Sequence, residues 1–419
     1  MKRFLWCLAT ALALLLLASS PAALAQVHVM IPKSSLPQPR NAQGQIMART
    51  HLRILVPAAD KMNFGTSVRP SELPPFAGYF FETPASLGCV YSLVHHSIPG
   101  CNPNVTTENP SGGSRAIALV EAFDDPTAAS DLAIFSAQFG LPPANLTVVY
   151  SNGAEPGTDP TGGFEIEAAL DTQWAHAMAP GARLFIVEAA DNSLVNLFNA
   201  VTVASNLVAA AGGGEVSMSW GSGEFTEETL FDSLFTKPGI VYLASAGDSP
   251  GVEYPSASPN VVSAGGTTIS RNSTTGNFIL ENTWQDVGGG PSQVEPRPAF
   301  QNGVRDVVGN VRGTPDLSFD SNPNTGVWVF DTNPVLGEGW FIVGGTSVAA
   351  PSLSGIINSA GSFRPSSQAE NQLIYGNLFN GFDFHDISYG DCGLNIGNFA
   401  VPGYDFCSGV GSPVGLHGK

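Results

Sequence analysis

A serine at the start of a predicted helix is the first residue in this sequence that could perform covalent chemistry. Residues 339–343 are predicted to form a strand, two glycines follow, and an apolar helix begins at or just after Ser347. The first N–H groups of a helix lack partners within the helix, so they could stabilise negative charge that develops beside the Ser347 hydroxyl. The commoner role of Ser347 or Thr346 at this position is to cap the helix. A base close to Ser347 would distinguish a nucleophile from a cap.

Two carboxylates spaced four residues apart could supply that base. Glu167 and Asp171 lie in a predicted helix over residues 163–178, and residues four apart share one face of a helix. Two neighbouring carboxyls resist simultaneous ionisation, so the pKa of one of them should rise. Glu167 could then accept the proton of Ser347 while Asp171 orients Glu167. A solvated helix face is the other interpretation of this acidic pair.

Histidine is the usual base for a serine nucleophile, but the histidines of this sequence are poorly placed for that role. His176 lies roughly 140° around the helix from Asp171 and about 180° from Glu167, so it would face away from both carboxylates. His95 and His96 are close to a cysteine pair. We therefore expect a carboxylate base and not a histidine triad.

A third acid follows a predicted strand. Asp248 comes directly after the apolar residues 240–246, and functional groups gather at the carboxyl ends of strands in parallel sheets. A buried, protonated Asp248 could donate a hydrogen bond to an oxyanion. The alternative is a turn aspartate that binds its own backbone.

Short apolar strands alternate with amphipathic helices along the chain. This alternation predicts an α/β fold whose parallel sheet is covered by helices on both faces. The predicted strands cover residues 116–123, 146–150, 183–189, 215–220, 240–246 and 260–264, and the predicted helices cover residues 128–139, 163–178 and 193–211.

Composition and charge indicate an exported globular protein. The chain has 419 residues, of which 43% are hydrophobic and only 12% charged, which excludes a disordered chain. Lys2 and Arg3, an apolar stretch and small residues before Gln26 predict a secretory signal over residues 1–25, with an uncleaved anchor as the alternative. Loss of Lys2 and Arg3 leaves 15 cations against 35 anions, a net charge of −20. Such a charge does not suit nucleic acid or anionic lipid as a partner.

Four cysteines remain after the predicted signal, and an even number in an exported chain predicts disulfides. Four cysteines permit three pairings. We favour Cys89 with Cys101 and Cys392 with Cys407, because each pair closes a short local loop. A zinc site is the alternative, but neither pair has the close spacing typical of zinc ligands.

In their order along the chain, these motifs resemble the sedolisin family, the serine-carboxyl peptidases. The resemblance implies a subtilisin-like three-layer sandwich with a central, mostly parallel sheet. The family's nucleophile, base, second acid and oxyanion acid match Ser347, Glu167, Asp171 and Asp248. Its edge strand, which pairs with the substrate backbone, matches the substrate-binding residues Ser219, Trp220 and Gly221. Further matching landmarks are Glu281–Trp284, Gly288–Ser292 and Arg312–Asp316.

The resemblance also implies one calcium ion in a C-terminal loop. Oxygen ligands suit calcium, and the implied ligands are two side chains and three backbone carbonyls. The side chains are those of Asp386 and Asp405, and the carbonyls are those of Ile387, Val401 and Gly403. The family usually has glycine where Val401 stands. Two unrelated turn aspartates are the alternative.

The chain before the peptidase-like part is short in comparison with the family, whose members carry a large folded pro-domain. We expect residues 26–82 to form an irregular leader or a remnant pro-segment, because they contain many prolines and little periodicity. Residues 83–419 are expected to form one peptidase domain that includes the calcium loop.

The resulting hypothesis is a secreted endopeptidase, extracellular or periplasmic, that acts as a monomer on proteins or peptides at acidic pH. It would have no nucleic-acid partner and no membrane contact after signal cleavage. The alternative is an exported protein without catalysis that binds peptides on the same scaffold.

Overall fold

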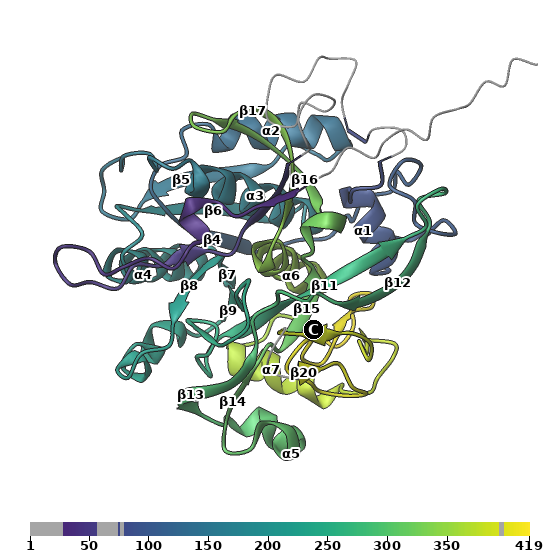
Figure 1. Cartoon of the computed structure of the whole chain (residues 1–419). Helices are drawn as coiled ribbons and strands as arrows, with labels where there is room; N and C mark the ends of the chain where they lie inside the picture. The colour runs from purple at the N-terminus through teal and green to yellow at the C-terminus, as the bar shows by residue number, and fades with distance from the viewer. Residues whose placement is uncertain (1–27, 57–73, 76–78, 394–397) are drawn as a thin grey trace, which may run out of the picture.

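The computed structural model describes residues 28–56, 74–75, 79–393 and 398–419 (Figure 1). The predicted signal over residues 1–25 lies outside the described residues. Among the residues that are described, no helix is long and apolar enough to cross a membrane.

A central sheet of eight strands organises the molecule. Six strands run parallel in the order β11, β9, β7, β4, β6 and β5, while β12 pairs antiparallel with β11 at one edge and β15 extends the sheet beside β11. Their bounds are β4 Ala116–Ala122, β5 Asn145–Tyr150, β6 Arg183–Ala189, β7 Gly214–Met218, β9 Ile240–Ser245, β11 Val262–Arg271, β12 Phe278–Thr283 and β15 Leu317–Asp320.

Side chains of the central strands alternate between two hydrophobic cores, one on each face of the sheet. In β9, Val241 and Leu243 belong to one core, whereas Ile240, Tyr242 and Ala244 belong to the other. This alternation follows from the two-residue period of a strand. The expected three-layer arrangement is therefore present, with apolar side chains buried both above and below the sheet.

Helices cover both faces. On one face α3 (Gly163–Met178) packs along α6 (Thr346–Ala360), and α2 (Ala128–Phe139) lies against α3. On the other face α4 (Leu194–Ala210) covers β4, β6 and β7. Figure 1 shows α3 and α6 near the centre of the molecule. The bounds of α2 and α3 confirm the predictions from the sequence.

The stretch expected to be an irregular leader contains three short strands. β3 (Arg53–Val56) lies between β1 (His28–Met30) and β17 (Gly337–Gly344), and β16 (Val327–Asn333) completes this sheet. β2 (Arg49–Thr50) pairs antiparallel with β8 (Trp220–Gly223). In Figure 1 these purple N-terminal strands lie against the body of the molecule. The strands are too short to show periodicity in the sequence, and the partners of β2 and β3 in β8 and β17 lie more than a hundred residues away.

The remaining elements surround the central sheet. They are α1 Pro84–Val90, β10 Glu253–Tyr254, β13 Gly290–Pro296, α5 Arg305–Val308, β14 Val311–Thr314, α7 Ser367–Gly376, β18 Phe384–His385, β19 Asp391–Cys392, β20 Asn398–Phe399 and β21 Ser412–Pro413. The part of the chain that the structure describes also contains short 3-10 turns at Lys33–Ser35, Glu228–Leu230, Asp232–Phe235, Ala299–Val304 and Pro323–Thr325.

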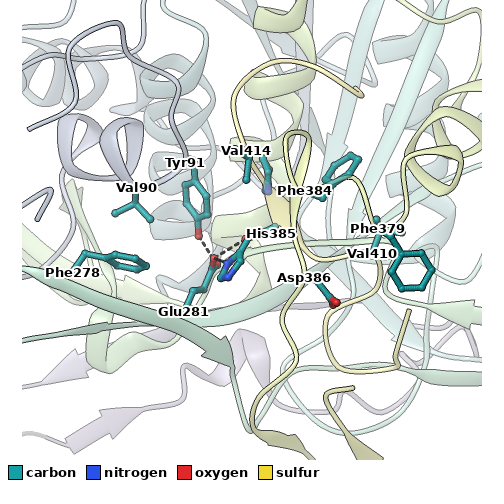
Figure 2. Close-up of a pocket in the computed structure, with 13 residues that line it drawn as sticks. Val90, Tyr91, Phe278, Glu281, Phe379, Phe384, His385, Asp386, Val410 and Val414 are labelled. Atoms are coloured by element: carbon teal, nitrogen blue, oxygen red, sulfur yellow. Dashed lines mark hydrogen bonds and ion pairs between the residues drawn. The ribbon is translucent and has the colours of Figure 1, made fainter. Parts of the chain in front are cut away.

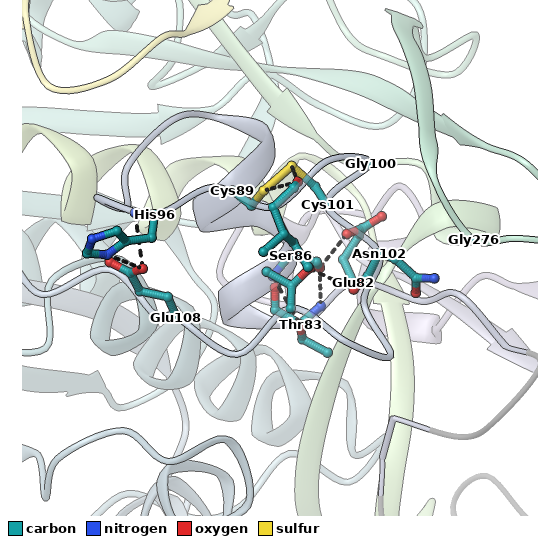
Figure 3. The surroundings of a disulfide bond; sticks show 12 residues. Glu82, Thr83, Ser86, Cys89, His96, Gly100, Cys101, Asn102, Glu108 and Gly276 are labelled. Carbon is teal, nitrogen blue, oxygen red and sulfur yellow. Dashed lines mark hydrogen bonds and ion pairs between the residues drawn. A yellow bond between two sulfur atoms is a disulfide. The ribbon is translucent and has the colours of Figure 1, made fainter.

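Both predicted disulfides are present, which rules out the zinc alternative for these cysteines. The Cα atoms are 5.5 Å apart in Cys89–Cys101 and also in Cys392–Cys407. Figure 3 shows the first disulfide beside α1, whose start is fixed by reciprocal hydrogen bonds between Thr83 and Ser86. A closed loop of about 15 residues is expected to stabilise a fold by roughly 3 kcal/mol.

The interior holds an unusual number of carboxyl groups. Burial, opposed by a hydrogen bond from Asn358, raises the pKa of Glu215 to about 8. Burial also raises the pKa of Asp125 to about 7 and that of Glu188 to about 9, in both cases against hydrogen bonds that favour the charged form. Each of these groups binds its proton more tightly in the folded chain than in the unfolded chain.

This difference predicts a fold that is more stable in acid than in mild base. A carboxyl with a raised folded pKa contributes stability below its unfolded pKa of about 4 to 4.5 and loses it as pH rises through the folded value. The free energy of unfolding should therefore fall by several kcal/mol between about pH 5 and pH 8, since one pKa unit corresponds to about 1.36 kcal/mol. Buried His176, whose pKa is lowered by desolvation, acts in the opposite direction.

Urea unfolding at the two pH values tests this prediction, with Glu215→Gln as the matched variant. The variant should lose part of the pH dependence because Gln carries no titrating proton. Equal or greater stability at the higher pH would contradict the prediction.

Candidate active site

Ser347 lies in the first turn of α6, directly after β17. Gly345 joins the two elements with a φ of 106°, a conformation that only glycine adopts readily. Gly345, which has no side chain, is also the N-cap, so neither Thr346 nor Ser347 has the capping role. The Ser347 side chain is fully buried, and its hydroxyl donates to the Ser219 carbonyl at 3.3 Å.

Glu167 and Asp171 lie on the buried face of α3, which excludes a solvated acidic face. Ser219 Oγ is 2.8 Å from each carboxyl oxygen of Asp171. Neither carboxyl oxygen of Glu167 has a hydrogen-bond partner. Burial, followed by the charge of Asp171, raises the pKa of Glu167 well above its ordinary value. The pair thus retains protons more strongly than solvated carboxyls would.

A hydrogen bond with the Ser347 hydroxyl opposes the rise in the Glu167 pKa, so this hydroxyl lies near the Glu167 carboxyl. Its hydrogen bond in the structure nevertheless goes to the Ser219 carbonyl. Transfer of the hydroxyl proton to Glu167 would therefore need a change in the hydroxyl direction. Apo sites often show such incomplete catalytic hydrogen bonds.

A third carboxyl, which the sequence analysis missed, faces this pair. Glu121 is fully buried near the end of β4, and its pKa is raised well above the ordinary value by burial and then by the charges of Asp171 and Glu167. Burial raises the pKa of Asp171 to about 7, while hydrogen bonds from Glu121 and Ser219 oppose this rise. An acid inside the otherwise apolar run of residues 116–122 was the available signal.

Asp248 follows β9 and binds the start of α6, not its own turn. Its Oδ1 accepts hydrogen bonds from the Thr346 N–H at 2.7 Å and from Thr346 Oγ1 at 3.0 Å. Its Oδ2 is 3.3 Å from Nη1 of Arg53. A Cβ added to Gly345 would lie 2.6 Å from this Oδ2 atom. Asp248 and the amide of Ser347 therefore face the same small space beside Gly345.

That space holds a carbonyl group of the chain itself. The Ser347 N–H donates to the His51 carbonyl oxygen at 3.1 Å. The His51 ring points elsewhere, with Nε2 2.9 Å from Glu253 and Nδ1 2.5 Å from Ser245 Oγ. His176 is also unsuited to act as a base, because its Nε2 binds the Pro142 carbonyl at 2.8 Å. Neither ring is directed at the serine.

The predicted substrate-binding residues begin at Ser219, whose carbonyl accepts the hydrogen bond from the Ser347 hydroxyl. Trp220 and Gly221 belong to β8, which pairs with Thr50 and Arg49. The indole of Trp220 is buried and donates to the Val120 carbonyl at 2.8 Å. The Ser219 side chain is engaged with Asp171, so its contribution to a ligand would come from its backbone.

The C-terminal loop brings the five predicted calcium ligands together. Asp386 Oδ2 accepts from the Gly403 N–H at 2.9 Å, and Asp405 Oδ2 accepts from the Val401 N–H at 2.9 Å. Ser408 Oγ lies 3.1 Å from Asp405 and 3.4 Å from the Ile387 carbonyl. Asp386 Oδ1 is buried without a partner, which fits a cation ligand. The N–H groups of Val401 and Gly403, and not their carbonyl groups, face the carboxylates of Asp405 and Asp386.

No group of three or more His, Cys, Asp or Glu side chains that could hold a metal occurs within the described ranges. A site with only two carboxylates, as predicted here, would not form such a group. The five predicted ligands are therefore neighbours, while their coordination of a cation stays a prediction.

A cavity of about 420 Å³ lies beside this loop (Figure 2). Tyr91 and His385 converge on Glu281 in its wall, and the Tyr91 hydroxyl donates to Glu281 at 2.9 Å. Apart from Asp386, none of the predicted site residues lines this cavity. It is therefore separate from the candidate catalytic residues.

Comparison with known proteins gives relatives of one kind, although no family model matches the chain. Kumamolisin from Bacillus sp. (strain MN-32) is 28% identical over 356 residues, which cover 74% of this chain and 60% of kumamolisin. Sedolisin from Pseudomonas sp. (strain 101) is 30% identical over 189 residues, 40% of this chain and 29% of the relative. Xanthomonalisin from Xanthomonas sp. (strain T-22) is 29% identical over 187 residues, 38% of this chain and 21% of the relative.

Solved structures agree in fold. The complex of Pseudomonas sedolisin, a serine-carboxyl proteinase, with pseudo-iodotyrostatin superposes with a TM-score of 0.66 at 22% identity. That match covers 80% of this chain and 95% of the sedolisin chain. The S41 psychrophilic protease matches with a TM-score of 0.51 at 19% identity, over 80% of this chain and 98% of the other.

The parallel α/β sandwich, with a serine at a helix start and buried carboxyls beside it, places the chain in the class of subtilisin-like folds. Within that class, the chain is similar to proteins of the sedolisin family. It spans about 60% of the length of kumamolisin and a smaller share of the other two relatives.

The hydrogen bonds of Ser219 to Asp171 predict a measurable contribution to stability. Ser219→Ala would leave a buried carboxyl without its hydroxyl donor, and hydrogen bonds to charged groups contribute about 1.5–3 kcal/mol. The free energy of unfolding, measured in urea at about pH 7, should fall by that amount. Ser222→Ala is the matched control, because its hydroxyl makes only a 3.3 Å contact with the neighbouring Gly223 carbonyl. Equal losses in the two variants would contradict this assignment.

Proposed function

We propose that the chain is an exported serine-carboxyl endopeptidase that hydrolyses peptide bonds in proteins at acidic pH. The observation that carries this proposal is the convergence of Ser347, Asp248 and buried carboxyls at the start of α6. The two disulfides support export, because disulfides persist in oxidising compartments.

In this mechanism Ser347 Oγ attacks the carbonyl carbon of the peptide bond. Glu167 accepts the hydroxyl proton and then gives it to the leaving amine, while Asp171 orients Glu167. The Ser347 N–H and Asp248 stabilise the oxyanion that forms. The backbone of Ser219, Trp220 and Gly221 binds the substrate as an added strand.

Glu121 extends the proton-sharing group from two carboxyls to three. Because all three are buried and their pKa values are raised, they retain protons at pH values where solvated carboxyls are ionised. As pH rises beyond about 7, the pKa of Asp171, the three carboxyls lose the protons that they share. Like charges then face one another around Glu167. Activity should therefore be high in acid and should decline toward neutral and basic pH.

A peptide-binding protein without catalysis is the second candidate. The full burial of Ser347 beneath other parts of the chain favours this candidate, because no substrate could reach the hydroxyl in this conformation. The two candidates differ in whether Ser347 is needed for any chemical change in a bound peptide.

Hydrolysis of denatured casein at about pH 4 distinguishes the candidates, with Ser347→Ala as the test variant. The wild type should cleave casein, and the variant should lose at least about a thousandfold in rate because it lacks the nucleophile. Glu167→Gln should lose activity to a similar degree. Maximal wild-type activity at pH 8, or equal activity in Ser347→Ala, would contradict the proposed mechanism.

We also propose that the C-terminal loop binds one calcium ion, on the basis of the buried, unpartnered Asp386 Oδ1 beside Asp405 and three candidate backbone carbonyls. Two carboxylates with carbonyl oxygens form a donor set that suits calcium. Bound calcium would stabilise the folded state, in which alone these ligands are neighbours.

Removal of calcium by a chelator should therefore lower the melting temperature. Addition of calcium, but not of magnesium, should restore it. A calcium concentration about 100-fold above the dissociation constant would contribute about 2.7 kcal/mol. Asp386→Asn should weaken this response, whereas Asp391→Asn, at an exposed residue of the nearby β19, should not. An unchanged melting temperature on addition of calcium to the chelated wild type would contradict the proposal.

A further inference from the structure

A buried disulfide near the C-terminus packs against a segment that leads to the candidate active site. The disulfide joins Cys392 to Cys407, and both side chains are buried. With Trp284 and Val287 the two cysteines form a small hydrophobic cluster, distinct from the cores on the two faces of the central sheet. Trp284 and Val287 belong to residues 284–289, which we call the connecting segment. The disulfide therefore fixes a contact between distant parts of the chain.

Hydrogen bonds hold the contact on the Cys392 side. Thr283 Oγ1 donates to the Asp391 carbonyl at 3.0 Å. The Gly393 N–H donates to the Gln285 carbonyl, also at 3.0 Å. Because these bonds lie on either side of Cys392 in the sequence, they tie β19 to the start of the connecting segment.

The backbone beside Cys407 lies against the other end of the connecting segment. A Cβ at Gly289 would lie 2.2 Å from the Phe406 carbonyl oxygen, so only glycine allows this approach. Phe406 stands between Cys407 and Asp405, one of the proposed calcium ligands, and Asp405 Oδ1 accepts the Cys407 N–H at 2.9 Å. The two halves of the disulfide thus contact opposite ends of the same short segment.

The connecting segment binds the turn that carries Asp248. The Gly288 N–H donates to the Gly247 carbonyl at 2.7 Å. The Gly289 N–H donates to the Gly251 carbonyl at 2.8 Å. These two bonds enclose Asp248 in the sequence, so the connecting segment holds both ends of the turn.

The placement of Asp248 depends in part on this turn. Thr346 binds Oδ1 of Asp248 with its N–H and hydroxyl groups, whereas the placement of Oδ2 also depends on the backbone that carries the side chain. A donor to an oxyanion acts over a narrow distance, roughly 2.7–3.1 Å. A displacement of about 1 Å at a reacting site can reduce a rate about a hundredfold. A small shift of this turn would therefore be visible in catalysis.

We propose that the disulfide Cys392–Cys407 positions Asp248 through the connecting segment, so that these two cysteines are positioning residues for the oxyanion step. This inference rests on the proposed peptidase function and deepens it by naming a structural control of the same site. Without the disulfide, Trp284 and Val287 lose buried partners, and the connecting segment gains freedom to move. The bonds from this segment to the Asp248 turn then become less well fixed.

The other disulfide provides a matched control. Cys89 and Cys101 also have Cα atoms 5.5 Å apart, and their separation in the sequence is 12 residues, against 15 for Cys392 and Cys407. Loops of similar length are expected to stabilise the fold to a similar degree. A variant without Cys89–Cys101 should therefore lose similar stability but keep the contacts of the connecting segment.

The first experiment compares the double variants C392A/C407A and C89A/C101A with the wild type. Hydrolysis of a casein-derived peptide is measured at about pH 4, at a temperature where circular dichroism shows all three proteins folded. C392A/C407A should lower kcat by about tenfold or more and change KM by less than about twofold, because an oxyanion donor acts in the transition state. C89A/C101A should keep kcat within about twofold of the wild type. Equal losses of kcat in the two variants would overturn the proposal.

A double-mutant cycle with Asp248→Asn separates positioning from general damage. Asp248→Asn alone should lower kcat by roughly 100- to 1000-fold, the loss typical of one oxyanion donor. In this background the further change C392A/C407A should alter kcat by less than about twofold, because the group that the disulfide positions is already lost. The same tenfold loss in both backgrounds would show a structural effect that does not act through Asp248.

A glycine variant tests the connecting segment while both disulfides stay intact. Gly289→Ala should lower kcat by about tenfold, because its methyl group would displace the Phe406 carbonyl from the segment. Gly303→Ala is the matched control, since no atom lies within 4 Å of a Cβ at that position. Wild-type kcat in Gly289→Ala would contradict a role of this segment in placing Asp248.

Hydrogen exchange on the full chain tests the link without any measurement of activity. Peptides that contain the Gly288 and Gly289 amides should exchange at least about tenfold faster in C392A/C407A than in C89A/C101A, because their hydrogen bonds open more often. Equal exchange would overturn the link between the disulfide and the Asp248 turn.

The outcomes distinguish this inference from the proposed function. Peptide hydrolysis by the wild type with equal kcat in the two cysteine variants would overturn the inference and leave the peptidase function intact. Absence of hydrolysis by the wild type would overturn the peptidase function and, with it, the assignment of Asp248 as the acid that the disulfide positions.

Discussion

The burial of three carboxyl groups against one another is the constraint on which the candidate site depends. Glu121, Glu167 and Asp171 come from β4 and α3 and are shielded from water by the close packing of α3 and α6. In such surroundings full ionisation of all three is costly, so protons are retained and shared. The hydroxyl of Ser219 partly compensates this cost at Asp171. The same desolvation that weakens the fold at high pH therefore creates the proton-transfer chemistry proposed for Ser347.

The position of Ser347 depends on a backbone constraint next to these acids. Gly345 turns the chain from β17 into α6 with a positive φ and leaves room for two oxygen atoms close to its Cα atom. Pro351, inside α6, has no N–H to bind the Ser347 carbonyl, and the Ser219 hydroxyl lies 3.5 Å from that carbonyl. The start of the helix is thus joined to β8, α3 and the Asp248 loop at once. A change in any of these elements would move the nucleophile.

The sequence predicted the central elements well because each carries a local signal. Each of α2 and α3 is a long run of mostly apolar residues without proline, and the paired acids of α3 differ clearly from their apolar neighbours. Glu121 was missed because a single acid in a strand has no periodicity or partner along the chain. The roles of Arg49, His51 and Glu253 could not be predicted, since they depend on contacts between residues about 200 positions apart. Short strands such as β2 and β3 gain their hydrogen bonds from distant partners and leave no pattern of their own.

The N-terminal segment and the buried acid Glu253 are best understood as one electrostatic unit. Without Arg49 and His51, Glu253 would be a buried carboxylate that has lost its ion pair with Arg49 and its contact with His51, and removal of one member of a buried pair costs several kcal/mol. The site would then have to admit water, protonate Glu253 or bind another cation. The contacts of Arg49 and His51 with Glu253 therefore join β2 to β10 across β8, and they stabilise the N-terminal segment and the buried carboxylate together.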